Sequence, residues 1–341
     1  MNDGNSDLKA IRVSVGSAVL LGLIQGKLVA KPTTIYLLTY RKGRCIANCG
    51  FCPQARESEG RTDMLSRVTW PVFTLQEVIE GIKRKIDEDK IERVCIQALN
   101  YPSVFWDIVK IVESVNKNVN VPISVSCQPL SLREMMYLRE VGAERVSIAL
   151  DAATESIFRT VKGEEANGPY TWKNHLNTLM QATKIFGKKR VTTHLIIGLG
   201  ESEEEAVKTI QYCHDIGVYP ALFAFTPIPG TRLEKKPRPP ISVYRRVQVA
   251  QYLITRDITR YERMIFEEGR IYSFGVPSET LLRIIENGEP FCTTGCPGCN
   301  RPYYNERPRG PIYNYPQKPD YEEIIKIKEE IRLQEVSLPR L

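Results

Sequence analysis

The chain has 341 residues, of which 42% are hydrophobic, and its formal net charge is +7 at pH 7. That length suits one large α/β domain with a sizeable core. The apolar stretch at residues 18–24 is too short to span a bilayer and lacks a cleavage pattern, so we expect a cytoplasmic protein without a membrane anchor. We also expect no nucleic-acid partner, because no aromatic and basic motif of the RNA-binding modules accompanies the positive charge.

Strands and helices are predicted to alternate through most of the chain. Residues 7–28 are predicted to form a helix that packs at one end of the main domain. Six short runs rich in β-branched residues then predict strands. The runs are residues 33–40, 93–99, 122–127, 145–150, 191–198 and 221–225. Capping-box pairs mark helix starts between them. The pairs are Thr74 with Glu77, Ser131 with Glu134, and Ser202 with Glu205.

This alternation predicts parallel strands with right-handed crossovers. Six such units make a partial (β/α)6 barrel, whereas a complete TIM barrel has eight. Beyond the last strand, the proline-rich residues 235–240 predict a loop. Residues 305–319 predict an extended arm and residues 321–336 a charged helix; the pattern at residues 263–273 does not decide between strand and loop. We therefore divide the chain into an N-terminal helical segment, a barrel and a C-terminal extension. Their bounds are residues 1–30, 31–234 and 235–341.

Six of the nine cysteines form two clusters with the same spacing. The clusters are Cys45, Cys49 and Cys52, and Cys292, Cys296 and Cys299. In a reducing compartment, clustered cysteines more often bind metal than form disulfides. A structural zinc site normally takes four ligands, but each cluster offers three. A 4Fe–4S cubane held by three cysteines leaves one iron open, so each cluster is a candidate iron–sulfur site.

The spacing of the first cluster, with Phe51 just before its last cysteine, resembles that of the radical S-adenosylmethionine (SAM) enzymes. The strand before the cluster and the strand–helix units after it strengthen the resemblance. In that family the open iron binds the amino and carboxylate groups of SAM. One electron then cleaves SAM to a 5′-deoxyadenosyl radical, which abstracts an unreactive hydrogen. The resemblance therefore implies a 4Fe–4S cluster, SAM and a low-potential electron donor.

Several loops resemble the biotin synthase-like branch of that family. Residues 197–201 (IGLGE) and 225–231 (FTPIPGT) match its fifth-strand and sixth-strand loops, and residues 95–98 (CIQA) match a segment near the methionine end of SAM. Asp151 lies where the branch has Asn-x-Asp, with Ala149 in place of the asparagine. The resemblance implies SAM contacts from Gln97, Asp151, His175, Gly198 and Ile228.

Two of these residues have plainer interpretations. Asp151, the candidate for the SAM ribose, could instead be a helix cap at the end of a strand. His175 falls where biotin synthases place an arginine near SAM, but it could instead be an ordinary surface residue of a helix.

The chain departs from biotin synthase at the second cluster. Biotin synthase holds a sulfur-donating 2Fe–2S cluster inside its barrel. Here Cys95 occupies one of those ligand positions, whereas Ser124 and Thr192 stand at or near the others. Hydroxyl groups are poor iron ligands, so we expect the barrel-bound cluster to be absent. This chain instead has three cysteines beyond the barrel in sequence.

A second cubane beside a radical SAM core is the layout of lipoyl synthases, and the whole chain most resembles their archaeal, two-protein type. That resemblance implies sulfur insertion into an octanoyl chain on a lipoyl-carrier protein, with the second cluster as sulfur donor and a second synthase protein as partner. In one-protein lipoyl synthases a serine near the C-terminus is the labile ligand of that cluster. Ser337 is in a comparable place, and other candidates compete with it. The competitors are Ser273, Ser278 and Arg301.

Other interpretations stay open at this point. The second cluster could only transfer electrons, or the pairs Cys49-x-x-Cys52 and Cys296-x-x-Cys299 could together bind one zinc ion. The enzyme could be a biotin synthase variant or a mutase of the same branch. An iron–sulfur scaffold without activity is disfavoured, because a carrier has no use for the SAM-facing loops.

Overall fold

The computed structural model of the chain describes residues 10–88 and 90–331. Six neighbouring parallel strands form the centre of its eight-stranded sheet, in the order β2-β6-β7-β8-β9-β10. They are β2 (Thr34–Thr39), β6 (Arg93–Gln97), β7 (Ile123–Cys127), β8 (Arg145–Ile148), β9 (Val191–Ile197) and β10 (Val218–Ala224). All six predicted strands are confirmed, and the architecture is the expected α/β partial barrel, with β10 left at one end of an open sheet.

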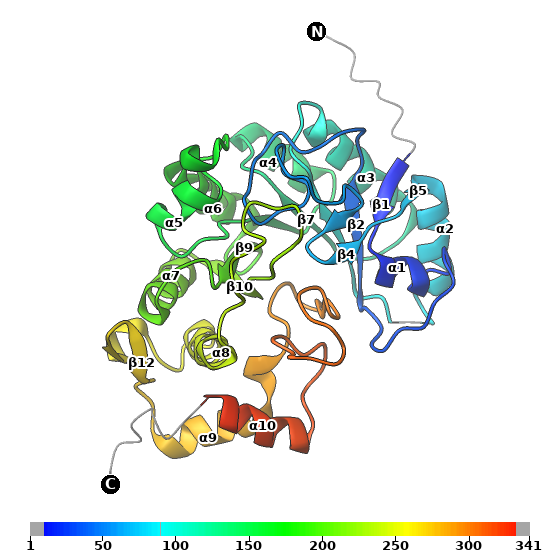
Figure 1. Ribbon diagram of the computed structural model, residues 1–341. Helices are drawn as coiled ribbons and strands as arrows, with labels where there is room; N and C mark the ends of the chain where they lie inside the picture. Colours follow the sequence, from blue (N-terminus) through cyan, green and yellow to red (C-terminus); the bar gives the residue numbers. More distant parts are fainter. Residues whose placement is uncertain (1–9, 89, 332–341) are drawn as a thin grey trace.

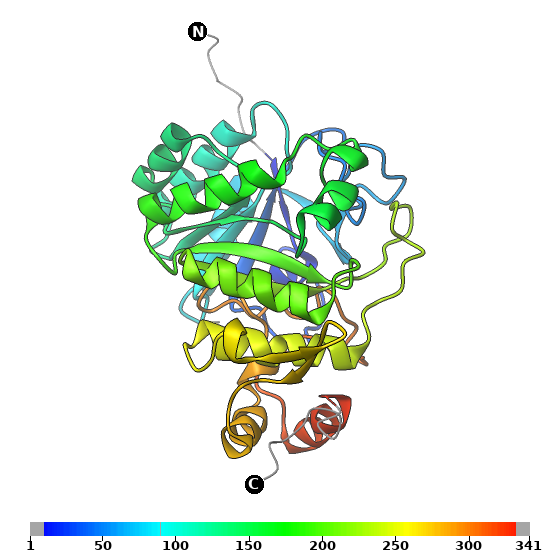
Figure 2. The ribbon, with the colours of Figure 1, turned by 90° about the vertical axis from the view of Figure 1, so that its left-hand side faces the viewer.

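Helices follow the strands and cover the outer face of the sheet (Figures 1 and 2). They are α2 (Leu75–Lys85), α3 (Val104–Asn118), α4 (Leu132–Glu140), α5 (Glu155–Val161), α6 (Trp172–Phe186) and α7 (Glu203–Asp215). A 3₁₀ turn, η1 (Glu164–Ala166), separates α5 from α6. The three predicted capping boxes are present at the starts of α2, α4 and α7.

The N-terminal prediction was wrong in part. Instead of one helix over residues 7–28, the described residues form a strand, β1 (Ala10–Val13), and a short helix, α1 (Val15–Leu20). β1 pairs antiparallel with β2 on one side and with β5 (Val72–Thr74) on the other. Its β-branched residues Ile11 and Val13 are fully buried. The free edge of β2 needed a hydrogen-bonding partner, and this tertiary demand outweighs local helix propensity.

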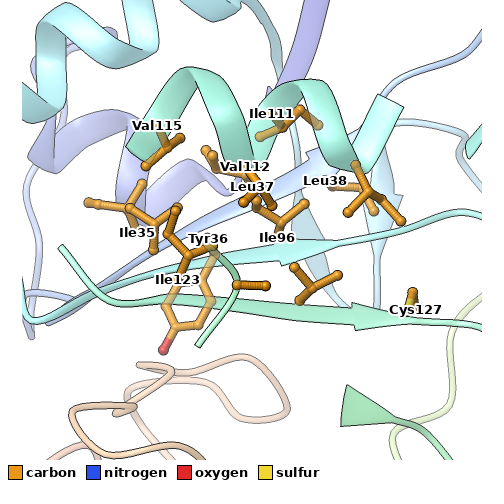
Figure 3. Close-up of a cluster of buried hydrophobic side chains, with 14 of the residues drawn as sticks. Ile35, Tyr36, Leu37, Leu38, Ile96, Ile111, Val112, Val115, Ile123 and Cys127 are labelled. Atoms are coloured by element: carbon orange, nitrogen blue, oxygen red, sulfur yellow. The ribbon is translucent and has the colours of Figure 1, made fainter. Parts of the chain in front are cut away.

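Alternate residues of the strands face opposite sides of the sheet. In Figure 3, Ile35 and Leu37 of β2 face Val112 and Val115 of α3, whereas the ring of Tyr36 points to the other side. The residues that face the helices form a continuous apolar core. The residues that face the other way line the interior of the barrel, so each strand contributes to both core and cavity.

The C-terminal extension adds helices beside α7 and β10, coloured yellow to red in Figure 1. They are α8 (Ile241–Thr255), α9 (Ser278–Asn287) and α10 (Tyr321–Ile331), with the turns η2 (Tyr261–Arg263) and η3 (Glu289–Phe291). Residues 263–273, whose pattern did not decide between strand and loop, contain a separate hairpin of β11 (Ile265–Glu267) and β12 (Arg270–Ser273). Another hairpin, formed by β3 (Met64–Leu65) and β4 (Val68–Thr69), precedes β5 in the N-terminal part of the chain. Residues 235–240 contain no helix or strand, as predicted. The predicted helix at residues 321–336 is confirmed over α10; the rest lies outside the described residues.

Residues 292–315, here called the C-terminal arm, cross the gap between β10 and the start of β2 and contact both. On the β10 side, Leu222 donates its N–H to Thr294 Oγ1 at 2.8 Å, and Asn305 Nδ2 donates to the carbonyl of Ala224 at 3.1 Å. On the β2 side, Thr33 Oγ1 donates to the carbonyl of Gly298 at 2.5 Å. The arm thus crosses the open side of the partial barrel, with Gly298 at the start of β2 and Asn305 at the carboxyl end of β10.

A buried ion pair joins the extension to the barrel. Arg246 of α8 contacts both carboxylate oxygens of Glu203 at the start of α7, and each side chain is at most 5% exposed. Glu203 also accepts the N–H of Ile271 in β12 at 2.9 Å. None of the helices among the described residues is long and apolar enough to cross a membrane.

We expect Arg246→Met to lower the free energy of unfolding by about 3–5 kcal/mol, because Glu203 would stay buried without a countercharge. Urea denaturation followed by circular dichroism measures the change. Arg256→Met is the matched control, since its ion pair with Glu289 is largely exposed and is expected to contribute about 1 kcal/mol or less. Equal losses in both variants would contradict the assignment of Arg246 as the main anchor.

Candidate functional site

Both cysteine clusters reach one cavity of about 300 Å³ inside the partial barrel. Cys45, Cys49 and Cys52 line it from the loop that follows β2, at the C-terminal ends of the strands. Cys296 and Cys299 line it from the C-terminal arm, at the opposite ends. These two also line an adjoining cavity of about 290 Å³ together with Cys292. The clusters therefore face each other across the barrel interior.

The first cysteine loop is held by backbone hydrogen bonds. Cys45 donates its N–H to the carbonyl of Gln54 at 3.0 Å, and the Asn100 N–H donates to Cys45 Sγ at 3.1 Å. Farther along this connection, the N–H groups of Glu59 and Gly60 donate to the carbonyl of Gly230, in the loop that follows β10. These contacts fix the loop over the carboxyl ends of the strands, where barrel enzymes place their sites.

The thiols of the first cluster need a positively charged partner in order to ionise. Burial raises the pKa of Cys49 to about 12 and raises the pKa of Cys52 well above its usual range. Such thiols stay neutral unless a metal supplies positive charge, and iron in a cluster does so. The donor set of three partly buried cysteines therefore fits an iron–sulfur cluster.

The second cluster lies inside the base of the barrel in space, although it lies beyond the barrel in sequence. Ser124 Oγ of β7 donates to Cys296 Sγ at 3.4 Å, and Thr192 Oγ1 of β9 is 3.8 Å from the same sulfur. The Tyr36 hydroxyl is 3.4 Å from Cys299 Sγ. The residues that replace biotin synthase ligands thus contact the arm's thiols. Three partly buried thiols, two of them with hydroxyl neighbours, also fit an iron–sulfur cluster.

The geometry excludes one zinc site shared by the two clusters, because Cys49 and Cys52 lie at the opposite ends of the strands from Cys296 and Cys299. Among the described residues, no three His, Cys, Asp or Glu side chains meet closely enough to hold a single metal ion. Cubane ligands bind different irons and are spaced more widely.

Four polar atoms of residues that line the larger cavity are buried without a hydrogen-bond partner. They are Gln54 Oε1, Gln128 Oε1, Arg301 Nε and the hydroxyl of Tyr304. Buried polar groups are normally satisfied, and exceptions concentrate where a ligand binds. The cavity is therefore equipped to receive a molecule with polar groups.

Asp151 lies beside the first cluster in a left-handed conformation, with φ of 66°, three residues beyond the end of β8. Its Oδ2 is 2.6 Å from Lys162 Nζ, and both side chains are at most 10% exposed. The side chain of Thr154, not that of Asp151, caps α5, so the helix-cap interpretation of Asp151 is wrong. The ion pair places one carboxylate and one ammonium at the wall of the cavity.

His175 is buried and lines the cavity, so its interpretation as a surface residue is wrong. Its ring packs edge-on against Phe158 and Tyr170, with centroids 5.0 and 5.1 Å away, and Nδ1 is 3.2 Å from the carbonyl of Thr171. Burial, helped by the nearby Lys162 charge, lowers the pKa of His175 to about 2. A neutral imidazole cannot supply the charge of an arginine, but Lys162 can.

Of the three other residues predicted to contact SAM, only one lines the cavity. Gln97 lines the cavity, but Gly198 and Ile228 do not. Gly198 instead donates its N–H to Glu201 Oε1 at 2.5 Å and packs against Pro239. Ser337 lies outside the described residues. Among the competing candidates for the labile ligand, Arg301 lines the larger cavity, whereas Ser273 lies in β12 and Ser278 begins α9.

Sequence reasoning missed Lys162, Tyr36 and Tyr304 as site residues. The inward position of Tyr36 follows from strand alternation, so that signal was present in the sequence. Lys162 meets Asp151 only because the chain turns back after α5, and Tyr304 reaches the cavity only through the fold of the arm. No local pattern identifies those two residues.

We expect Lys162→Met to weaken SAM binding about 10- to 100-fold, because the variant loses a charge-assisted hydrogen bond from the Lys162 ammonium to a polar group of SAM. Such a bond contributes roughly 1.5–3 kcal/mol. Equilibrium dialysis of the reconstituted protein with labelled SAM measures the affinity, and its iron content reports an intact cluster. Lys173→Met, on the exposed face of α6, is the control. Unchanged affinity in Lys162→Met would remove Lys162 from the SAM site.

Comparisons with known proteins agree with this geometry. Residues 41–213 match the model of the radical SAM superfamily. A biotin synthase of Hydrogenobaculum sp. (strain Y04AAS1) is 26% identical over 203 residues, which are 58% of this chain and 57% of that protein. A 7,8-didemethyl-8-hydroxy-5-deazariboflavin synthase of Methanococcus maripaludis (strain C6) is 25% identical over 174 residues, 49% of this chain and 47% of that protein.

Among solved structures, methylornithine synthase (PylB) has a TM-score of 0.51 at 16% identity, over 70% of this chain and 66% of that chain, which supports the fold. The chain spans less than two thirds of the length of the curated relatives named above. The family match takes in half of the chain, including the first cysteine cluster. The protein therefore belongs to the radical SAM superfamily.

Proposed function

We propose that this protein inserts sulfur into an octanoyl chain carried on a protein lysine, as one of the two proteins of an archaeal-type lipoyl synthase. The observation that carries the proposal is that two cysteine clusters face one cavity from opposite ends of the same strands. A substrate lying between them would have a radical source on one side and a sulfur source on the other.

Apolar side chains on the cavity walls support an acyl substrate. They come from several strands and from the first cysteine loop. They include Leu38, Phe51, Val125, Ile196, Phe223 and Phe225. Each methylene group that leaves water for such walls contributes about 0.8 kcal/mol, so an unbranched octanoyl chain gains affinity along its length.

Membership in the superfamily implies a 4Fe–4S cluster and SAM at the first site, held by Cys45, Cys49 and Cys52. When bound, this pair supplies the radical that abstracts hydrogen. The Lys162–Asp151 pair and the neutral His175 would then bind polar groups of SAM at the wall. In the proposal, Cys292, Cys296 and Cys299 hold a second 4Fe–4S cluster that provides sulfide.

The chain's own residues would shield this chemistry. The C-terminal arm covers the base of the cavity. At the opposite end of the cavity, the hydrogen bonds of Glu59 and Gly60 to Gly230 fix the first cysteine loop against the loop that follows β10. Excluding water protects a carbon radical from side reactions. The proposal includes three protein partners in the cytoplasm: the octanoylated carrier protein, the second synthase protein and a low-potential electron donor.

A second candidate is sulfur insertion of the biotin synthase kind, favoured by the similarity to a biotin synthase and by the inward-facing Cys95 on β6. The absence of matching thiols at Ser124 and Thr192 weighs against it. A second cluster that only transfers electrons would instead favour another radical SAM reaction, since its sulfide would remain in place.

A single-turnover assay tests the proposal. Anaerobically reconstituted protein is mixed with SAM, reductant and an octanoyl-lysine peptide, with and without the partner protein, and read by mass spectrometry. We expect the peptide to gain sulfur, with 5′-deoxyadenosine formed in proportion. Deoxyadenosine without sulfur gain would contradict the octanoyl substrate, and dethiobiotin would then test the second candidate.

Cysteine variants separate the two clusters. We expect Cys45→Ala to abolish SAM cleavage, because the first cluster loses a ligand. Cys296→Ala should instead keep uncoupled SAM cleavage and lose sulfur transfer. Cys213→Ala, a buried thiol of α7 outside both cavities, is the control and should behave as the unaltered protein. Sulfur transfer by Cys296→Ala would sink the idea that the second cluster donates sulfide.

A further inference from the structure

We infer that Cys95 of β6 is the fourth protein ligand of the second iron–sulfur site, on the side that faces the larger cavity. The site then has four thiols, three from the C-terminal arm and one from the barrel itself. This inference rests on that part of the proposed function which places a cluster at Cys292, Cys296 and Cys299.

The sheet register places Cys95 between the residues that contact the arm's thiols. Cys95 is the direct neighbour of Tyr36 on β2 and of Ser124 on β7. Side chains at the same register position of adjacent parallel strands point to the same face of a sheet. The Tyr36 hydroxyl is 3.4 Å from Cys299 Sγ, and Ser124 Oγ is 3.4 Å from Cys296 Sγ. Cys95 therefore faces the same side of the sheet as the two residues that contact those sulfurs.

The two cavities show on which side each thiol lies. Cys296 and Cys299 line both cavities, whereas Cys292 lines only the smaller one and Cys95 lines only the larger one. Cys292 and Cys95 thus adjoin the central pair from different cavities. Four cysteine thiolates are the donor set that a 4Fe–4S cluster takes.

The electrostatic surroundings agree with this geometry. Burial raises the pKa of Cys95 well above its usual range, and the neighbouring Cys296 and Cys299 raise it further. Two cations, Arg301 and Arg93, oppose this rise in the pKa of Cys95. Arg301 donates its backbone N–H to the Tyr36 hydroxyl at 2.9 Å, and its guanidinium lies 3.7 Å from the ring centre of Phe223. Its charge offsets part of the negative charge of four thiolates.

Other side chains at the site are less suitable as the fourth ligand. Tyr36 and Ser124 carry hydroxyls, and the Ser124 hydroxyl donates its hydrogen to a sulfur. Hydroxyl donors of this kind orient thiolates rather than replace them. Cys127 lies at the far end of β7, three residues beyond Ser124 towards the carboxyl ends of the strands.

The experiment uses the full chain with Cys45, Cys49 and Cys52 all replaced by alanine, so that any cluster formed belongs to the second site. Cys95→Ala and Cys95→Ser are added to this background, with Cys213→Ala as the matched control that also removes a buried thiol. Iron and sulfide content, Mössbauer spectra and electron paramagnetic resonance (EPR) spectra are recorded. Circular dichroism checks that each variant is folded.

We expect the background protein and the Cys213→Ala control to hold about four irons per chain with four similar iron sites. Cys95→Ala should lose one iron on mild oxidation and show the EPR signal of a three-iron cluster. Cys95→Ser should keep its iron but show one distinct site in the Mössbauer spectrum. Cys95 variants identical to the background would overturn the inference, and so would a background protein that binds no cluster.

The sulfur-insertion assay keeps this inference separate from the proposed function. If the Cys95 variants change the cluster as expected but the unaltered protein adds no sulfur to the octanoyl peptide, the proposed function fails and the ligand assignment stands. If sulfur is added but the Cys95 variants leave the cluster unchanged, the ligand assignment fails alone.

Discussion

The structure depends on how the open side of a six-stranded parallel sheet is covered. A complete barrel pairs its last strand with its first, but here β10 stays at one end of the sheet. Its backbone groups need partners, because unpaired edges expose donors and acceptors. The C-terminal arm provides them through Thr294 and Asn305 and then contacts the start of β2 through Gly298. The segment that covers the gap is the one that carries the second cysteine cluster.

The same constraint shapes the chemistry of the interior. Because strand residues alternate, one set packs against the helices and the other faces the cavity. Tyr36, Cys95 and Ser124 form a row across three strands at the base, and the arm's sulfurs lie against it. The first cluster is fixed at the opposite end by its loop. The distance between the two cysteine clusters is thus set by the length of the strands that separate them.

Local patterns in the sequence predicted the strands, the capping boxes and the first cysteine loop, since each depends on neighbouring residues. They failed for β1, which forms because β2 needs a partner. They also failed for His175, since its helical position carries no sign of the Phe158 and Tyr170 rings that bury it. The position of the second cluster depends on contacts such as that of Thr33 with Gly298, 265 residues apart. No short-range pattern encodes a contact of that separation.

The position of the arm late in the sequence affects the order in which the protein folds during synthesis. Domains fold from the N-terminus as the chain emerges, and contacts between distant residues form late. The six strands are complete once Ala224 has emerged, but the base of the barrel remains open until residues near Gly298 follow. During that interval the inward-facing Cys95 has no arm over it. For the second iron–sulfur cluster of the proposed function, iron loaded before the arm has folded would therefore meet an incomplete set of ligands.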